Sequence, residues 1–253
     1  MPAGPPETAP ERILTGERTW PGIPEEMYWF SRHLACYEWV ATKVAAQVPV
    51  GAMVLDAGAG EGYGAQAIAQ RTSGRVFAAD LDLPTVAHLG ANYPDAVGVV
   101  ANLIALPFRD RAFAAAVSLQ VIEHMWDPRS YLRELDRCSR GPIVISTPNR
   151  PVHSPGLGPG EDPQNPFHVR EFDSAELRAL VETALSARPV ALFGLHHGDR
   201  IQRWEGRHGS LASALLEEDA RARDFAATVT AADFTIAPLT DDDATAQDLI
   251  ALW

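Results

Sequence analysis

The sequence is poor in lysine, in cysteine and in long apolar runs, and each scarcity excludes a class of protein. Lys43 is the single lysine among 21 basic residues, and the formal net charge is −12. Because no basic stripe is present to neutralise phosphates, we expect no nucleic-acid partner. Cys36 and Cys138 lack the spacing of a disulfide or metal pair, so we expect reduced thiols in the core. No apolar run approaches a membrane span, and residues 1–10 lack the apolar segment of a signal peptide. We therefore expect a cytoplasmic protein with no membrane partner.

The rest of the composition is that of one globular domain with additions. The chain has 253 residues, of which 46% are hydrophobic, enough to build a sizeable core. Residues 1–24 are rich in proline, glycine and glutamate and are expected to form a mobile N-terminal arm. Residues 25–253 are expected to form a single domain. Its first part, 25–47, is aromatic and amphipathic and predicts a cap helix, from which Tyr28, Arg32 and His33 could face a ligand.

Short apolar strands alternate with helical segments from Gly51 onward. The expected strands are 53–56, 75–80, 96–100, 114–119, 142–146 and 189–195. The expected helices are 63–70, 84–92, 128–138 and 174–185, the last two opened by Asp-Pro and Asp-Ser capping signals. Alternation on this scale predicts an α/β fold, with a mainly parallel sheet and helices on both faces.

The end of the chain predicts one more strand. Residues 248–253 are apolar, and we expect them to pair antiparallel with 189–195 inside the sheet, as the last of seven strands. Residues 196–247 would then be a long excursion before the last strand. Excursions of that length in a compact domain are usually binding elements, so we expect a lid-like insertion.

A glycine-rich turn follows the first expected strand, with the sequence Asp56-Ala57-Gly58-Ala59-Gly60-Glu61-Gly62-Tyr63. Alternate glycines let the backbone turn sharply and let a ligand approach it closely. The turn fails the dinucleotide fingerprint, because Tyr63 stands at the third glycine position. A carboxylate at the strand end repels pyrophosphate but binds a cationic amine, directly or through water. The turn resembles motif I of the class I S-adenosylmethionine-dependent methyltransferases. The resemblance implies cofactor binding by Asp56, Gly58, Gly60 and Gly62.

Further segments resemble the same family in order and spacing. Asp80 ends the second expected strand, where an acid accepts hydrogen bonds from ribose, with Asp82 as a competing candidate. Leu81, Leu103 and Gln120 are further cofactor contacts implied by the resemblance. Asn102 stands where the family usually has an aspartate for the adenine amino group, and its amide oxygen can still accept that hydrogen bond.

Three later segments resemble the branch that methylates sugars, glycans, quinones and other small acceptors. They are Leu119-Gln120-Val121-Ile122-Glu123-His124, Ile145-Ser146-Thr147-Pro148-Asn149-Arg150 and Asn165-Pro166-Phe167-His168-Val169-Arg170-Glu171-Phe172. The resemblance implies a Rossmann-like sheet and a small-molecule or oligosaccharide acceptor. The tail 194–253, including Val229-Thr230-Ala231-Ala232-Asp233-Phe234, resembles an actinobacterial sub-branch associated with mycofactocin-type oligosaccharides.

Three residues are candidates for the catalytic base. A hydroxyl acceptor is a poor nucleophile until its proton leaves, so a histidine or carboxylate nearby would help. His168 and the pair Glu123–His124 follow two neighbouring strands and are predicted to meet at the carboxyl edge of the sheet. A hydrogen bond that merely fixes a loop is the alternative role for each of them.

Several alternatives remain open from the sequence. His196, His197 and Asp199 could contact the acceptor or form a satisfied turn. The run Asp241–Asp243 is better explained as a solvated helix start than as a metal site, and we expect no metal. The acceptor could instead offer an aromatic hydroxyl, an amine or a carbon nucleophile. A catalytically silent regulatory partner is a further alternative, and the oligomeric state is not determined.

Overall fold

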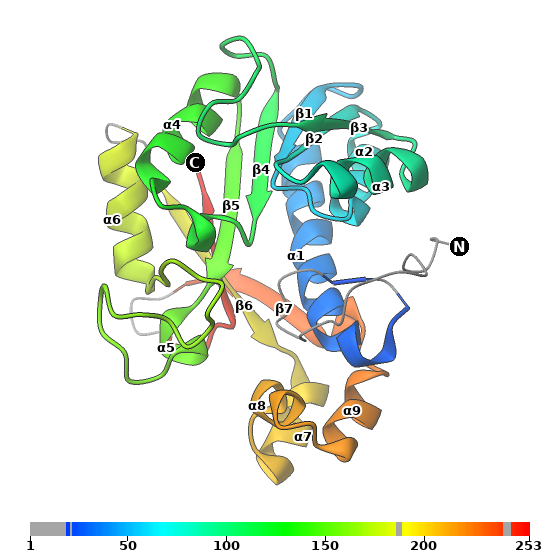
Figure 1. Cartoon of the computed structure of the whole chain (residues 1–253), viewed down its shortest axis with the longest axis vertical. Coiled ribbons are helices and arrows are strands. Elements are labelled where there is room, and N and C mark those ends of the chain that lie inside the picture. The colour runs from blue at the N-terminus through cyan, green and yellow to red at the C-terminus, as the bar shows by residue number, and fades with distance from the viewer. Residues whose placement is uncertain (1–18, 21, 186–188, 240–243) are drawn as a thin grey trace.

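The protein is built on one eight-stranded sheet flanked by helices (Figure 1). The structure is a computed structural model and describes residues 19–20, 22–185, 189–239 and 244–253. The strand order is β3-β2-β1-β4-β5-β8-β6-β7. The strands are β1 Met53–Ala57, β2 Arg75–Asp80, β3 Ala96–Val100, β4 Ala115–Leu119, β5 Ile143–Pro148, β6 Ala191–His197, β7 Phe234–Pro238 and β8 Asp248–Leu252.

The α/β fold and the buried last strand are both confirmed. β1 to β5 pair in parallel, whereas β8 lies between β5 and β6 and is antiparallel to both. Ile250 of β8 is the partner of Ser146 in β5 and of Phe193 in β6. This position accounts for the apolar character of the tail, because a strand inside a sheet is covered on both faces.

The prediction of seven strands was wrong by one. β7 pairs antiparallel with β6 at the edge of the sheet, inside the segment assigned to the excursion. Only Phe234 of this strand is buried, and Ile236 is half-buried. A strand with so few buried positions gives a weak alternating pattern in the sequence. β7 is recognised as a strand by its pairing with β6 and not by its own sequence.

Helices cover both faces of the sheet, as predicted. α1 Met27–Ala45, α2 Tyr63–Thr72 and α3 Leu83–Asn92 pack on one face, and α4 Pro128–Cys138 and α6 Ser174–Ala184 pack on the other. Side chains along each strand alternate between the two layers, so that Val54 points to the first and Leu55 to the second. Each layer has its own apolar core.

Local capping explains where three of these helices begin. Asp82, Asp127 and Asp173 each accept a backbone N–H of the first turn of α3, α4 and α6. Asp173 also forms a reciprocal capping box with Glu176. Asp82 is therefore a helix cap, which leaves Asp80 as the acid that ends β2.

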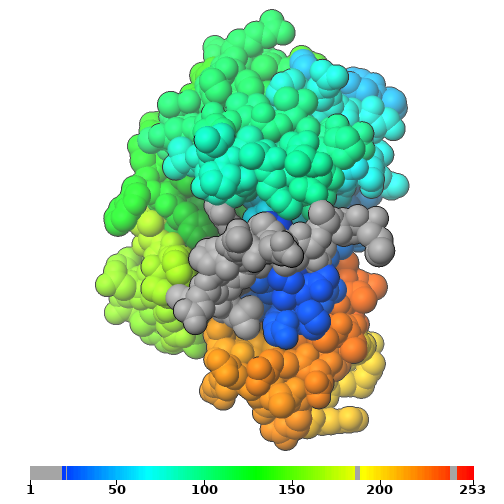
Figure 2. Space-filling view, turned by 45° about the vertical axis from the view of Figure 1, so that its right-hand side comes forward, coloured from blue at the N-terminus to red at the C-terminus, as the bar shows by residue number. Residues whose placement is uncertain are grey.

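The excursion between β6 and β8 is largely helical. It contains α7 Asp199–His208, α8 Leu211–Leu216, α9 Ala220–Ala226 and the 3-10 turn η3 Ala231–Asp233, followed by β7. Figure 2 shows this part at one end of the molecule, with α2 and α3 at the opposite end. The lid role of 196–247 stays a prediction. Thr230 and Asp233 form a capping box at η3, so these two residues of the distinctive tail motif serve local structure.

Three short helical elements lie between the longer helices and strands. They are the 3-10 turns η1 Pro24–Glu26 and η2 Ile122–His124 and the helix α5 Arg150–His153. Most of the expected arm lies outside the described residues. Its described end is packed, since Thr19 and Trp20 are buried and the Trp20 N–H donates to Glu26 Oε2 at 2.7 Å. Within the described ranges, no helix combines the length and apolar character needed to cross a membrane.

Candidate active site

A pocket that opens to solvent lies at the carboxyl ends of the central strands. Its walls come from α1, from the turn after β1, from the ends of β4 and β5 and from the start of β8. β1 and β4 are neighbours, although the chain runs from β1 outward to β2 and β3 before it returns. Such a reversal of strand order is where open α/β sheets bind their ligands.

The glycine turn forms one wall and fits a ligand at its middle residue. Gly58, Gly60 and Gly62 all have positive φ, at 80°, 50° and 96°. A Cβ added at Gly60 would meet nothing within 4 Å, so that position faces open space. A Cβ at Gly58 would lie 2.4 Å from Val121, and one at Gly62 would strike Leu89. Gly58 and Gly62 thus allow close packing of the turn, and Gly60 is the glycine that leaves room for a ligand.

Asp56 lies beneath this turn rather than in the pocket wall. It is fully buried, and the Tyr37 hydroxyl, which lines the pocket, donates to its Oδ1 at 3.4 Å. Its Oδ2 is buried and has no hydrogen-bond partner. Burial, together with the nearby charge of Asp80, raises the pKa of Asp56 to about 7, although the Tyr37 hydrogen bond opposes the rise. A nearby positive charge on a ligand would favour the ionised form of this carboxyl group.

Asp80 holds the glycine turn from the neighbouring strand. Its Oδ2 accepts the Gly60 N–H at 3.0 Å, and its Oδ1 accepts the Asp82 N–H at 3.0 Å. The acid predicted for ribose is therefore in direct contact with the loop predicted for the cofactor. Leu81, the next residue, is 70% exposed.

The residues after β3 are placed less favourably for binding. Asn102 is exposed, and its Oδ1 accepts the Ile104 N–H at 3.1 Å. Of the two lone pairs on this oxygen, which was predicted to bind the adenine amino group, one is therefore already used by the neighbouring backbone. Leu103 packs into the core layer under α4. Any contact of Leu103 with a cofactor would therefore come from its main chain.

Gln120 enters the pocket from the end of β4. It has a positive φ of 56°, and its Nε2 donates to Ser146 Oγ at 3.0 Å and to Asp248 Oδ1 at 3.2 Å. Asp248 is itself paired with Arg32, whose Nε donates to Asp248 Oδ2 at 2.7 Å, and both side chains are buried. This ion pair fixes the start of β8 against α1.

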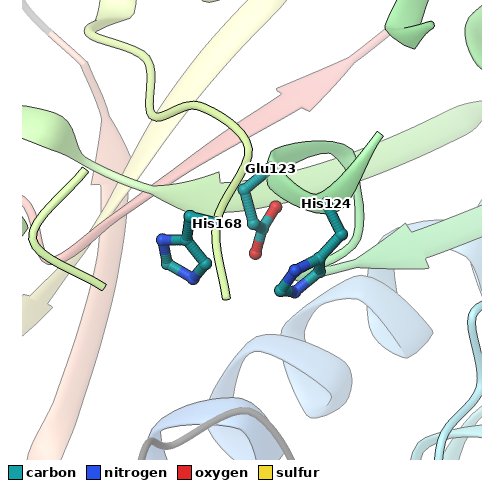
Figure 3. Close-up of side chains that lie close together, drawn as sticks. All are labelled: Glu123, His124 and His168. Carbon is teal, nitrogen blue, oxygen red and sulfur yellow. The ribbon is translucent and has the colours of Figure 1, made fainter. Parts of the chain in front are cut away.

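The three candidate bases do come together (Figure 3). Glu123 and His124 belong to η2 after β4, and His168 lies on the loop after β5. Potential ligand atoms of the three side chains lie within 4.8 Å of one another. The His168 and His124 rings are edge to face, with centroids 5.2 Å apart. The predicted convergence of the two loops is confirmed.

Other residues named from the sequence have structural partners. His197 Nδ1 donates to Glu205 Oε2 at 2.9 Å, and its Nε2 accepts from the buried Tyr28 hydroxyl at 2.8 Å. This chain of bonds joins α1, β6 and α7, so Tyr28 and His197 serve the fold. His33 does line the pocket, as predicted for the cap helix. Asp241–Asp243 lie outside the described residues.

The sequence interpretation missed the pocket residues Cys36, Tyr37, Ser146 and Asp248. Tyr37 stands four residues after His33, which places both on one face of α1. That spacing was the available signal for Tyr37. Asp248 gave none, because its place beside Gln120 depends on where β8 enters the sheet.

Comparisons with known proteins agree with this geometry. Residues 55–142 match the model of the methyltransferase domain family. A protein of Mycolicibacterium smegmatis, named "Probable S-adenosylmethionine-dependent methyltransferase", is 40% identical over 94% of this chain and 93% of its own length. A protein of Mycobacterium tuberculosis that is likewise named a probable S-adenosylmethionine-dependent methyltransferase is 43% identical over 78% of this chain and 69% of its own length.

Solved structures support the fold. A S-adenosylmethionine-dependent methyltransferase of Thermotoga maritima, described as a possible histamine N-methyltransferase, matches with a TM-score of 0.58. It is 13% identical, and the match covers 88% of this chain and 91% of that one. The [4+2]-cyclase SpnF matches with a TM-score of 0.51 at 15% identity, over 85% of this chain and 80% of that one. At such identities the likeness concerns the fold alone.

The pocket has the features that S-adenosylmethionine requires. The open side of Gly60 leaves room for a ligand beside the glycine turn. Asp56 lies beneath that turn and is linked to the pocket through the Tyr37 hydroxyl, so its negative charge favours a cationic ligand. Asp80 lies at the same turn, where its Oδ2 accepts the Gly60 N–H. Together with the family match and the relatives, these features show an enzyme that uses S-adenosylmethionine as its methyl donor. The chain belongs to the class I S-adenosylmethionine-dependent methyltransferases.

Proposed function

We propose that the enzyme methylates a hydroxyl group of a sugar, an oligosaccharide or a glycosylated small metabolite. The observation that carries the proposal is the meeting of Glu123, His124 and His168 at the carboxyl edge of the sheet. S-adenosylmethionine, when bound, supplies a methyl group on a sulfonium centre.

The cluster fits a hydroxyl better than an amine or a carbon acceptor. A hydroxyl oxygen must lose its proton as the oxygen–methyl bond forms, while the electron pair of the broken sulfur–carbon bond stays on sulfur. An uncharged amine needs no such help before it attacks. Glu123 is held by the Thr147 hydroxyl at 3.0 Å, and His168 by Glu171 at 2.7 Å, so both groups are oriented. Oriented groups of this kind favour a hydroxyl acceptor.

Two exposed aromatic rings beside the cluster support a carbohydrate. Trp126, two residues after His124, is 85% exposed, and Phe167, next to His168, is 49% exposed. Sugar rings bind aromatic faces through their C–H groups while their hydroxyls reach polar side chains. Trp126 and Phe167 are thus exposed aromatic residues close in the chain to the groups that would receive the hydroxyl.

The names of the mycobacterial relatives state no acceptor, so a mycofactocin-type oligosaccharide is proposed only on the resemblance of the tail. The tail motif adds little to this finer assignment, because Thr230 and Asp233 cap η3. Such oligosaccharides therefore belong in the acceptor panel, together with simpler sugars, phenols and amines.

The first test is a screen of that panel with S-adenosylmethionine that carries a deuterated methyl group. We expect a mass increase of one labelled methyl on hydroxyl-bearing sugars or glycosides. Transfer to phenols alone would favour the aromatic-hydroxyl alternative. Transfer to amines alone would overturn the proposal.

The second test uses single-turnover kinetics once an acceptor is found. His168→Ala and Glu123→Ala should each lose at least ~100-fold in rate, with S-adenosylhomocysteine affinity unchanged. Leu216→Ala is the matched control, because Leu216 is an exposed side chain at the end of α8. Losses of only a few fold in both variants would mean that positioning alone carries the reaction.

A further inference from the structure

We infer that Glu123, His124 and His168 are the protein ligands of a divalent transition-metal ion. The inference rests on the proposed function only for the role of the ion, since the site itself is defined by geometry. The sequence analysis expected no metal in the chain, and this inference departs from that expectation. The candidate weighed there was the run Asp241–Asp243, which lies outside the described ranges. The cluster at η2 has a distinct donor set.

The donor atoms are close enough to share one ion. They lie within 4.8 Å of one another, and Figure 3 shows the Glu123 carboxylate between the two imidazole rings. Ligands bound to one ion at about 2.0–2.2 Å are themselves about 3.3 Å apart in a tetrahedral site. Side-chain adjustments that shorten the separations by up to about 1.5 Å would bring the donor atoms to that spacing. η2 and the loop after β5 are fixed together, because Val169 N–H donates to Glu123 O at 2.8 Å.

Each of the three side chains also has the outer partner that metal ligands need. His168 Nδ1 lies 2.7 Å from Glu171 Oε1, and His124 Nδ1 lies 3.0 Å from the Phe167 carbonyl oxygen. Glu123 Oε2 accepts from the Thr147 hydroxyl at 3.0 Å. Ligating histidines almost always donate their second ring N–H to a carboxylate or carbonyl in this way.

The tautomers follow from these partners. The Glu171 carboxylate and the Phe167 carbonyl act as acceptors, so Nδ1 of each ring is the donor. Nε2 of each neutral ring then has the lone pair that binds a metal. Asn165 Nδ2 lies 3.0 Å from His168 Nε2, which agrees with Nε2 as an acceptor. An ion would take the place of that amide donor.

The charges and the donor atoms of these side chains indicate which metal ions would bind. Glu123 and Glu171 put two carboxylates beside two imidazoles, and the side chain of Glu171 is fully buried. Two nitrogen ligands and one oxygen suit Zn²⁺, Mn²⁺ or Co²⁺, whereas Mg²⁺ and Ca²⁺ prefer oxygen alone. Three protein ligands leave positions for a further oxygen, as in catalytic metal sites.

In the proposed reaction the ion would hold the acceptor oxygen and ease loss of its proton, so that with the ion bound Glu123 and His168 would act as its ligands and not as the bases that take the proton. A divalent cation lowers the pKa of a bound hydroxyl group, so the proton can pass to solvent while the oxygen keeps the electron pair. The oxygen then attacks the methyl carbon. Two neighbouring hydroxyls of a sugar could occupy two open positions at once, which would add selectivity for a vicinal diol.

The test is metal binding by the full chain, stripped with a chelator and dialysed. Calorimetry with Zn²⁺ and visible absorption with Co²⁺ should each show one ion per chain. His168→Ala and His124→Ala should weaken binding by at least ~100-fold, and Glu171→Gln, an outer partner, by ~10–100-fold. His208→Ala is the matched control, because His208 is an exposed histidine on α7 that should not change binding.

S-adenosylhomocysteine affinity, measured in the same samples, reports folding and separates the two proposals. We expect it to be unchanged in every variant. No ion bound to the wild type, or equal binding in His168→Ala and the wild type, would overturn the metal site and leave the hydroxyl acceptor untouched. One ion lost specifically in the ligand variants, in an enzyme that methylates only amines, would support the site and remove the proposed acceptor.

Discussion

At the scale of single residues, Asp56 has its chemistry because of where it is buried. The residue type and its place before the glycines are visible in the sequence, but full burial and the long Tyr37 hydrogen bond are not. Burial raises the pKa of Asp56 to about 7, so its charge changes near neutral pH. A carboxyl group in that state couples ligand binding to pH.

Binding of S-adenosylhomocysteine should strengthen as pH rises between about 6 and 8. Below its pKa of about 7, Asp56 is protonated and must release its proton to offer a carboxylate to the ligand's ammonium group. Asp56→Asn should bind more weakly and show a much flatter pH dependence. Calorimetry at three pH values checks this. An equally steep dependence in Asp56→Asn would assign it to another group.

The same shift predicts how the ligand-free protein responds to pH. The pKa of Asp56 is higher in the folded chain than its unfolded value of 3.8. Between about pH 4 and pH 7 the Asp56 carboxyl group is therefore protonated in the folded chain and ionised in the unfolded chain. The free energy of unfolding should therefore fall as pH rises from about 4 to about 7, and Asp56→Asn should lack this contribution. Urea unfolding of both variants measures it.

Gly58→Ala and Gly60→Ala should fail for different reasons. Both positions have positive φ, which costs an alanine about 1–2 kcal/mol. The new Cβ at Gly58 also meets Val121 at 2.4 Å, so Gly58→Ala should unfold more easily than Gly60→Ala. The Cβ at Gly60 points into open space, so Gly60→Ala should lose S-adenosylhomocysteine affinity. Its loss of stability should be limited to the cost of the positive φ.

Adding Val121→Ala distinguishes the two causes. It should restore part of the stability of Gly58→Ala and none of the ligand affinity of Gly60→Ala. Thermal unfolding and calorimetry give both quantities. The sequence had suggested that a ligand could approach the backbone at each of the alternate glycines, whereas the structure places Val121 beside Gly58.

At the scale of elements, β8 joins the two halves of the sheet. It is paired on both sides, and Leu249, Ile250 and Ala251 are fully buried. At its first residue, burial opposes ionisation of Asp248, but the charge and hydrogen bonds of Arg32 outweigh it and lower the pKa of Asp248. The strand thus fixes α1 and the pocket together.

Deleting residues 248–253 should destabilise the protein far more than deleting residues 1–10. The deletion removes a central strand and leaves the Arg32 guanidinium buried without its carboxylate, which alone costs about 3–5 kcal/mol. We expect the melting temperature to fall by at least about 10 °C, since about 1 kcal/mol corresponds to 2–4 °C at this size. Calorimetric melting of both truncations tests this, and equal tolerance would contradict it.

At the scale of the whole molecule, the pocket is assembled from segments far apart in the chain. Gln120, Ser146 and Asp248 meet because β4, β5 and β8 are adjacent in the sheet. Their sequence separation gives no sign of this contact. The excursion with α7, α8 and α9 forms one end of the molecule (Figure 2), and its weakly patterned edge strand β7 shows why the strand count was missed.

The sequence by itself determined the elements whose signals are local. Alternating apolar strands, aspartate caps and the glycine turn depend on neighbouring residues, so they predicted the α/β fold, the cofactor turn and the two loops that bear the candidate bases. Tertiary structure decided what depends on partners across the sheet. The register of β8, the burial that shifts the pKa of Asp56 and the outer partners of His124 and His168 all arise from non-local contacts. Burial and hydrogen-bond geometry exist only once the chain is packed, and local patterns do not encode them.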